Sequence, residues 1–205
     1  MSSQSHWDGV YQTKAADAVS WYPPHLEESL DYIRRTGAGA DAAIVDIGGG
    51  EATLVDDLLD LGYRDVSVLD LSARAIEVCR ERLGERAARV RWWVGDVLAH
   101  VFEPGSVDVW HDRAVFHFLT GEEQRRRYVG QVCRALKPGG FAIVGAFGPE
   151  GPLQCSGLPV ARYAPGELHG EFGARFRLLE HRTSVHRTPA GALQQFVYCY
   201  CRLQS

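Results

Sequence analysis

The sequence has 205 residues, of which 45% are hydrophobic and 23% charged, as is ordinary for a globular domain with a substantial core. Its formal net charge of -4 disfavours a nucleic-acid partner, because proteins that bind phosphate backbones usually present a basic surface. Five cysteines, an odd number, favour reduced thiols, and no apolar signal core or stretch of transmembrane length stands out. We therefore expect a cytoplasmic protein without a membrane or nucleic-acid partner, and the sequence makes no prediction of its oligomeric state.

Residues 1–42 stand apart from the rest and are predicted to form a helical lid or cap segment. Residues 25–37 are typical of an amphipathic helix, because Leu26, Leu30 and Ile33 fall on one face and two prolines precede them. The stretch before this helix is rich in aromatic residues and ends near Trp21 and Tyr22. It either packs over the rest of the fold or covers a ligand, and the sequence leaves both open.

Residues 43–205 are predicted to form one α/β domain. Strand and helix patterns alternate, which indicates a parallel sheet covered by helices. Strands are expected at 42–48, 66–70, 89–96, 106–112 and 141–147, and helices at 52–62, 72–84 and 121–136. Ser72 is the expected N-cap of the second of these helices, and Gly62 and Gly84 are the expected stops of the first two.

The C-terminal part changes pattern. After a loop rich in glycine and proline (148–162) and a short helix (164–173), strand patterns at 176–187 and 194–203 follow each other without an intervening helix. Two adjacent strands joined by a turn form an antiparallel pair. Cys199 and Cys201 lie two apart in the second strand, share one face and are expected in the core.

The stretch "VDIGGGEATL" places three consecutive glycines between the first strand and its helix. Such a turn lets a ligand approach the backbone and meet amide N–H groups. Asp46, Asp70 and Asp96 each end a strand, so the three carboxylates share the edge of the sheet where ligands bind, and Asp70 is placed to accept ribose hydroxyls. A nicotinamide site is disfavoured, because Thr53 stands at the third glycine of the dinucleotide fingerprint.

From residue 43 to the C-terminus the chain resembles the class I S-adenosylmethionine-dependent methyltransferases of the small-molecule type. "VDIGGGEATL", "VLDLS", "GDV" and "LKPGG" match motifs of that family, although Ala52 stands where the family often has a further glycine. The resemblance implies a Rossmann-like, seven-stranded, mostly parallel sheet with an antiparallel last strand and helices on both faces. It implies S-adenosyl-L-methionine as cofactor and S-adenosyl-L-homocysteine as product. The implied cofactor-binding residues are Asp46, Gly48, Gly49 and Gly50 for the methionine moiety, Asp70 for the ribose, and Leu71, Asp96 and Val97 for the adenine.

The stretch "WHDRAVFHFL" is similar to the family segment that passes under the sulfonium. It makes His117, His111 and Asp112 candidate catalytic residues, and Asp112 and Arg113 further candidates for cofactor binding. A histidine base would serve an amine or hydroxyl acceptor, whereas a thiolate needs little such help. As alternatives, His117 packs or caps a helix, and Asp112 pairs with Arg113. No metal site is expected, because the spacing of these side chains matches no strong ligand pattern.

The loop over 148–162 is long for a connection in a compact domain and is predicted to roof a substrate pocket. The candidate substrate-binding residues are Trp21, Tyr22, Cys155, Arg162 and Tyr163. For Cys155, a packing role is the favoured alternative. The sequence thus predicts methyl transfer to a small-molecule acceptor, with a soft thiol or metalloid nucleophile and an oxygen or nitrogen nucleophile both open. The alternatives are a protein lysine methyltransferase, a cofactor-binding module without turnover and, last, a nicotinamide oxidoreductase.

Overall fold

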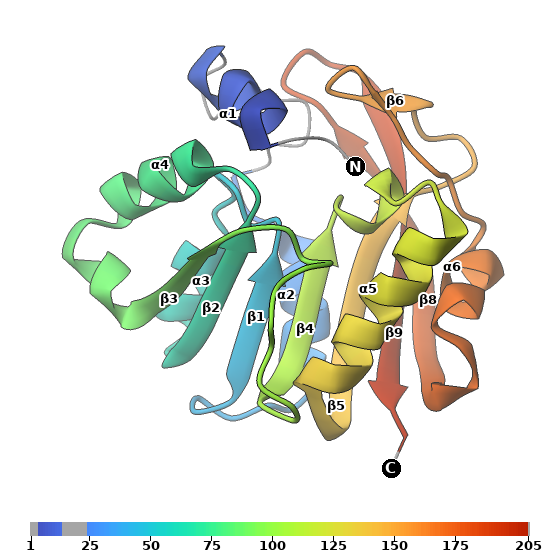
Figure 1. Ribbon diagram of the computed structural model, residues 1–205, viewed down its shortest axis with the longest axis horizontal. Helices are drawn as coiled ribbons and strands as arrows, with labels where there is room; N and C mark the ends of the chain where they lie inside the picture. The colour runs from blue at the N-terminus through green and yellow to red at the C-terminus, as the bar shows by residue number, and fades with distance from the viewer. Residues whose placement is uncertain (1–3, 14–23, 205) are drawn as a thin grey trace.

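A computed structural model of the chain describes residues 4–13 and 24–204 and contains a seven-stranded sheet with the order β3-β2-β1-β4-β5-β9-β8 (Figure 1). The strands are β1 (Ala43–Ile47), β2 (Asp65–Asp70), β3 (Val90–Val94), β4 (Val107–Arg113), β5 (Leu136–Phe147), β8 (Phe176–Arg187) and β9 (Leu193–Leu203). The first five pair in parallel, and β9 runs antiparallel to both β5 and β8. The predicted Rossmann-like sheet with its antiparallel end is confirmed.

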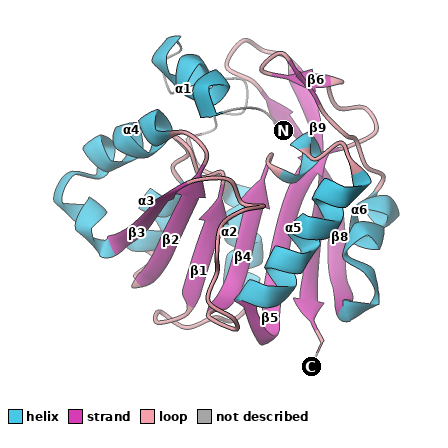
Figure 2. Cartoon of the chain, viewed as in Figure 1, coloured by secondary structure: helices cyan, strands magenta, loops and turns pink. Residues whose placement is uncertain are grey.

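Helices cover both faces of the sheet (Figure 2). They are α2 (Glu27–Arg35), α3 (Leu54–Asp60) and α4 (Ala73–Leu83), which share one buried cluster, and α5 (Glu122–Ala135) and α6 (Pro165–Phe172), which share the other. Side chains alternate along a strand, so Ile44 belongs to the first cluster and Val45 to the second. In the same way Val109 and Trp110 of β4 lie in opposite clusters. Cys199 and Cys201 are fully buried in the second cluster, as predicted.

The ends of the helices follow the sequence signals. The Ser72 hydroxyl accepts a hydrogen bond from the Ala75 N–H at 3.2 Å, as an N-cap does. Gly62 and Gly84 have φ of 87° and 57°, the left-handed conformation expected after a helix. The stretch "LKPGG", which lies between the predicted helix and the predicted strand, forms the first part of β5, and the pairing of β5 with β4 shifts register after Val107.

A helix near the N-terminus and a short hairpin were not predicted as individual elements. Helix α1 (Gln4–Thr13) contacts α4, and the short strands β6 (Gln154–Cys155) and β7 (Leu158–Pro159) form a hairpin inside the long loop. Figure 1 shows α1 and β6 beyond the carboxyl ends of the parallel strands. Trp21 and Tyr22 lie outside the described residues. Both new segments therefore lie at the edge of the sheet where a ligand is expected.

Candidate active site

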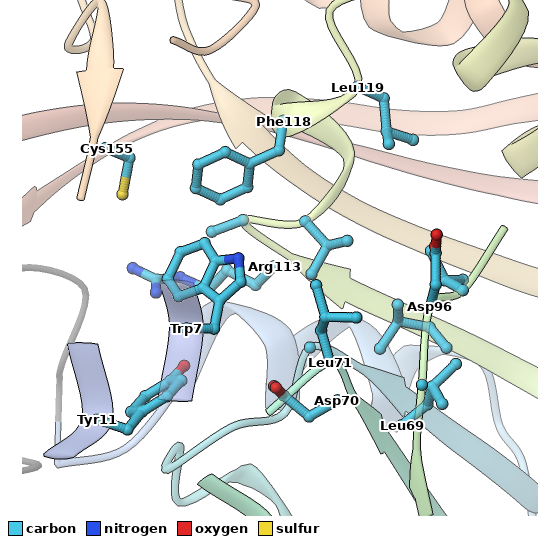
Figure 3. Close-up of a pocket in the computed structure, with 16 residues that line it drawn as sticks. Trp7, Tyr11, Leu69, Asp70, Leu71, Asp96, Arg113, Phe118, Leu119 and Cys155 are labelled. Atoms are coloured by element: carbon cyan, nitrogen blue, oxygen red, sulfur yellow. The ribbon is translucent and has the colours of Figure 1, made fainter. Parts of the chain in front are cut away.

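A cavity opens at the carboxyl ends of β1, β2 and β4 (Figure 3). Its volume is about 760 Å³ with the part open to solvent included. The lining comes from α1 (Trp7, Tyr11), the glycine turn (Ile47, Gly48), the end of β2 (Leu69, Asp70, Leu71), the segment after β3 (Gly95, Asp96, Val97), the segment after β4 (Arg113, Ala114, Val115, Phe118, Leu119) and β6 (Cys155). The predicted residues Gly48, Asp70, Leu71, Asp96, Val97, Arg113 and Cys155 are thus brought together.

The glycine turn requires its glycines. Gly48 has φ of 69°, and its N–H donates to the Leu69 carbonyl at 2.7 Å. A Cβ on Gly48 would lie 2.1 Å from Cγ2 of Val115, and one on Gly50 would lie 2.7 Å from the Tyr11 hydroxyl. Both the backbone conformation and the close approach of neighbouring side chains exclude a larger residue.

Asp70 ends β2 as a buried carboxyl group at the cavity wall. It accepts a hydrogen bond from the Ser72 N–H at 2.8 Å, and burial raises its pKa to about 7. Asp96, two residues beyond β3, accepts a hydrogen bond from the Leu98 N–H at 2.8 Å. Both side chains line the cavity, so each can accept hydrogen bonds from a ligand.

Asp46 and His111 lie behind the glycine turn and outside the lining of the cavity. They are partners in the register between β1 and β4, and Nδ1 of His111 lies 2.7 Å from the Asp46 carboxylate. The other ring nitrogen, Nε2, lies 2.8 Å from the hydroxyl of Ser29 on α2. Both ring nitrogens are therefore engaged with protein groups, which leaves neither directed at an acceptor.

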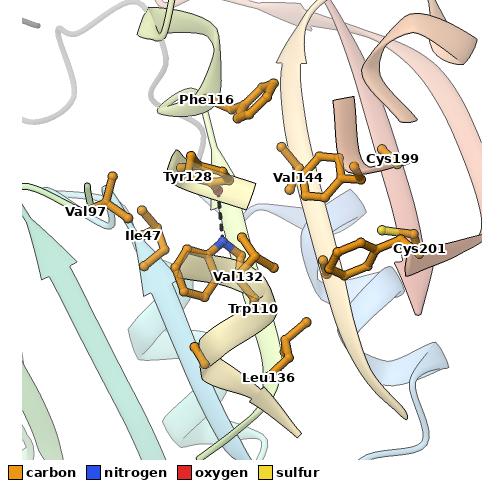
Figure 4. Close-up of a cluster of buried hydrophobic side chains, with 14 of the residues drawn as sticks. Ile47, Val97, Trp110, Phe116, Tyr128, Val132, Leu136, Val144, Cys199 and Cys201 are labelled. Atoms are coloured by element: carbon orange, nitrogen blue, oxygen red, sulfur yellow. Dashed lines mark hydrogen bonds between the residues drawn. The ribbon is translucent and has the colours of Figure 1, made fainter. Parts of the chain in front are cut away.

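Asp112 points to the opposite face of the sheet from His111 and is fully buried. It accepts hydrogen bonds from the N–H groups of Val115 (2.9 Å) and Phe116 (3.1 Å) and from the Tyr128 hydroxyl. Figure 4 shows the next bond in this network, from Nε1 of Trp110 to the Tyr128 hydroxyl at 2.9 Å. Burial raises the pKa of Asp112 to about 6. The carboxylate shapes the turn after β4 and does not line the cavity.

Arg113 and His117 differ in their access to the cavity. Arg113 lines it, with its guanidinium 4.3 Å from the centre of the Phe196 ring. The next residue, Ala114, has φ of 75°, a strained conformation for a residue other than glycine. His117 is fully buried, with its ring 4.4 Å from that of Phe147, and among the described residues neither ring nitrogen has a hydrogen-bond partner. Burial lowers its pKa to about 3, so the ring is neutral.

Helix α1 forms part of the cavity roof. Trp7 and Tyr11 are four residues apart, so they share a face of α1, and Trp7 meets Phe118 edge-on at 5.2 Å (Figure 3). Asp8 accepts hydrogen bonds from the Ser72 hydroxyl and, at 3.4 Å, from the Arg74 N–H. It thus attaches α1 to the N-terminus of α4. In the sequence, the four-residue spacing of Trp7 and Tyr11 within "HWDGVY" was the pattern that could have predicted this helix.

Arg162 and Tyr163 lie outside the lining of the cavity. The Arg162 guanidinium donates to the carbonyls of Pro149 (2.7 Å) and Gly151 (3.2 Å), which braces the long loop. Tyr163 is buried, and its ring lies 5.6 Å from that of Phe116. The described residues include no cluster of three or more potential ligands for a metal ion and no helix that is long and apolar enough to cross a membrane.

Comparison with known proteins agrees with this geometry. Residues 44–140 match a family model described as a methyltransferase domain. An eEF1A lysine and N-terminal methyltransferase from Bos taurus is 27% identical over 144 residues, or 67% of this chain, which spans 20% of that relative's length. EEF1A lysine methyltransferase 2 from Homo sapiens is 23% identical over 197 residues, which cover 88% of this chain and 76% of the relative.

The fold has counterparts among solved structures. A protein studied for the conversion of a disulfide bond into a thioacetal group during echinomycin biosynthesis aligns with a TM-score of 0.78 and 20% identity. The alignment covers 98% of this chain and 92% of that one. The matching family model, the strand order and the position of the cavity agree, and they identify residues 44–140 as a class I S-adenosylmethionine-dependent methyltransferase domain.

Proposed function

We propose that this chain transfers the methyl group of S-adenosylmethionine to a small-molecule acceptor inside the cavity. The observation that carries the proposal is the mixture of groups that line one cavity. The glycine turn and the carboxyl groups of Asp70 and Asp96 belong to the same lining as Trp7, Phe118 and other apolar groups. The polar groups suit a nucleoside with an amino-acid tail, and the apolar groups suit the exclusion of water from a reacting carbon.

The side chains fit the cofactor of the family. Gly48 lines the cavity and carries no side chain, so the methionine moiety can approach its backbone. We expect Asp70 to accept hydrogen bonds from the ribose hydroxyls and Asp96 and Val97 to contact the adenine, because all three residues line the cavity. The bound cofactor supplies a methyl group activated by a sulfonium. The task of the chain is then to align an acceptor with that group, which is an entropic and geometric contribution.

We infer that the acceptor is a soft nucleophile such as a thiolate, because neither candidate histidine is suited to act as a general base. His111 has both nitrogens engaged, and the low pKa of His117 makes it a poor base near neutral pH. A thiolate attacks without a general base. Its sulfur forms a bond with the methyl carbon as the bond from that carbon to the sulfonium breaks, giving two thioethers. Cys155 and Arg113 line the cavity and remain candidates for contact with this acceptor.

Calorimetric titration tests the cofactor assignment first. S-adenosylhomocysteine is expected to bind the wild type, NADH is not, and Asp70→Ala should weaken binding because the ribose loses its acceptor. Binding of NADH alone would refute the assignment. A radiolabelled methyl donor offered with a panel of small thiols and matched amines then tests the acceptor class. Label in the thiols, with a rate that rises with pH as each thiol ionises, supports the proposal, and label in the amines alone overturns the thiol preference.

A second candidate is methylation of a lysine side chain on a protein. It is favoured by the human lysine methyltransferase that aligns with 88% of this chain. The same labelled donor, incubated with a protein extract and separately with the thiol panel, distinguishes the two. Label in an acid-stable protein fraction, with none in the small molecules, would establish the second function in place of the first.

A further inference from the structure

A hydrogen-bonded network of buried polar side chains crosses the apolar layer between the sheet and α2. Asp46, His111 and Ser29 are at most 3% exposed. The network continues from the Ser29 hydroxyl to the hydroxyl of Tyr198 on β9, and these two oxygens are 3.5 Å apart. Four elements of the fold, namely β1, β4, α2 and β9, each contribute one side chain to it.

The apolar surroundings of this network make its burial unfavourable for the stability of the fold. The layer around it is built from aliphatic and aromatic side chains, including Leu30 on α2, Ile44 on β1 and Val109 on β4. Burial of polar and charged groups is unfavourable unless each finds a partner, and a pair of apolar residues avoids that cost. A carboxylate at position 46, with a histidine across the register from it, therefore indicates a use for the carboxylate at this place.

The place is the underside of the glycine turn. One carboxylate oxygen of Asp46, Oδ1, is bonded to His111, while Oδ2 lies 2.7 Å from the position that a Cβ on Gly49 would take. Asp70 flanks the same turn, since one of its carboxylate oxygens lies 3.2 Å from the position that a Cβ on Gly50 would take. The second oxygen of Asp46 thus faces the backbone of Gly49, beneath the turn at which the methionine moiety is proposed to bind.

We propose that His111 and Ser29 are positioning residues that hold the Asp46 carboxylate in the orientation that receives the amino group of the cofactor. The direction of the hydrogen bonds follows from Asp46, because a carboxylate only accepts. Nδ1 of His111 donates to Asp46, and Nε2 accepts from the Ser29 hydroxyl. This inference rests on the proposed function, since it assumes that S-adenosylmethionine binds at the turn.

The test compares two ligands that differ only at the amino-acid end. S-adenosylhomocysteine carries the amino group, and 5′-methylthioadenosine keeps the adenine, ribose and sulfur without it. Replacing His111→Leu is expected to weaken binding of S-adenosylhomocysteine roughly tenfold, as for the loss of a charge-assisted hydrogen bond, and to change the affinity for methylthioadenosine less than about twofold. His111→Asn, which keeps a donor near Nδ1, should recover part of the loss.

Two serines give a milder test with a matched control. Ser29→Ala is expected to weaken the binding of S-adenosylhomocysteine about twofold to fivefold, because it removes only the outer hydrogen bond of the network. The affinity for methylthioadenosine should not change. Ser67 is also buried, on β2, and accepts a hydrogen bond from Nε of Arg91 at 3.1 Å. Ser67→Ala should therefore leave both affinities unchanged.

The outcomes separate this inference from the proposed function. If the variants at positions 111 and 29 weaken the binding of both ligands equally, or change the affinity for neither, the positioning role is overturned. The cofactor assignment would stay intact in either case. If His111→Leu does not fold, the Ser29→Ala comparison decides the question. Failure of the wild type to bind either ligand would overturn the proposed function and this inference with it.

Discussion

The raised pKa of Asp70 predicts a specific dependence of stability on pH in the protein without cofactor. Burial raises this pKa from 3.8 to about 7, so the folded state holds a proton on Asp70 that the unfolded state has released. Ionisation of the buried carboxyl group lowers the free energy of unfolding. This loss of stability is absent below the unfolded pKa, grows as the pH rises from about 4 and is complete above about 7. A shift of about 3 pH units corresponds to at most about 4 kcal/mol.

Asp70→Asn removes the ionisation and keeps the shape of the side chain and an acceptor for the Ser72 N–H. We expect the variant to be more stable than the wild type at pH 8, and the difference to grow by about 2 to 3 kcal/mol between pH 5 and pH 8. Urea unfolding of both proteins across this range measures it. The same variant should bind S-adenosylhomocysteine more weakly, so stability and affinity change in opposite directions. A difference in stability that does not vary with pH would refute the reasoning.

Three further substitutions test other parts of the site. Gly48→Ala is expected to abolish measurable binding of S-adenosylhomocysteine in calorimetry, because of the positive φ and the 2.1 Å approach to Val115, and unaltered binding would show that the turn adapts. Asp8→Ala should destabilise the attachment of α1 by about 1 kcal/mol, the value of a capping interaction with Ser72, and should speed release of S-adenosylhomocysteine in stopped-flow experiments. His117→Leu should leave the pH–rate profile between pH 6 and 8 unchanged and should not lower the melting temperature, because a buried imidazole with this pKa is neutral in that range. If the substitution removes the rise or fall of the rate with pH, His117 acts as a base.

The sequence predicted the fold in detail because its signals were local. Continuous apolar runs marked the strands, and Ser72 and Gly84 marked the limits of α4. The long antiparallel pair followed from the absence of helical periodicity after residue 176. Helix α1 was missed because its residues are of mixed polarity and only one of them, Tyr11, is buried.

The candidate site was predicted less completely, for reasons that lie in the pairing of the strands. His111 and Asp112 were grouped as catalytic candidates, but adjacent residues of a strand point to opposite faces, so one meets Ser29 and the other meets Tyr128. Alternation alone was enough to separate them. The pairing of His111 with Asp46 depends on the register between β1 and β4, which no local pattern specifies.

The roof of the cavity is made of two segments with separate attachments. Helix α1 rests on α4 above Gly50 and Asp70, whereas Cys155 belongs to a hairpin that follows β5, more than a hundred residues later in the chain. Both segments line the same cavity, through Tyr11 of α1 and Cys155 of the hairpin. A ligand bound in the cavity would therefore contact two parts of the chain that are distant in the sequence and would hold them together.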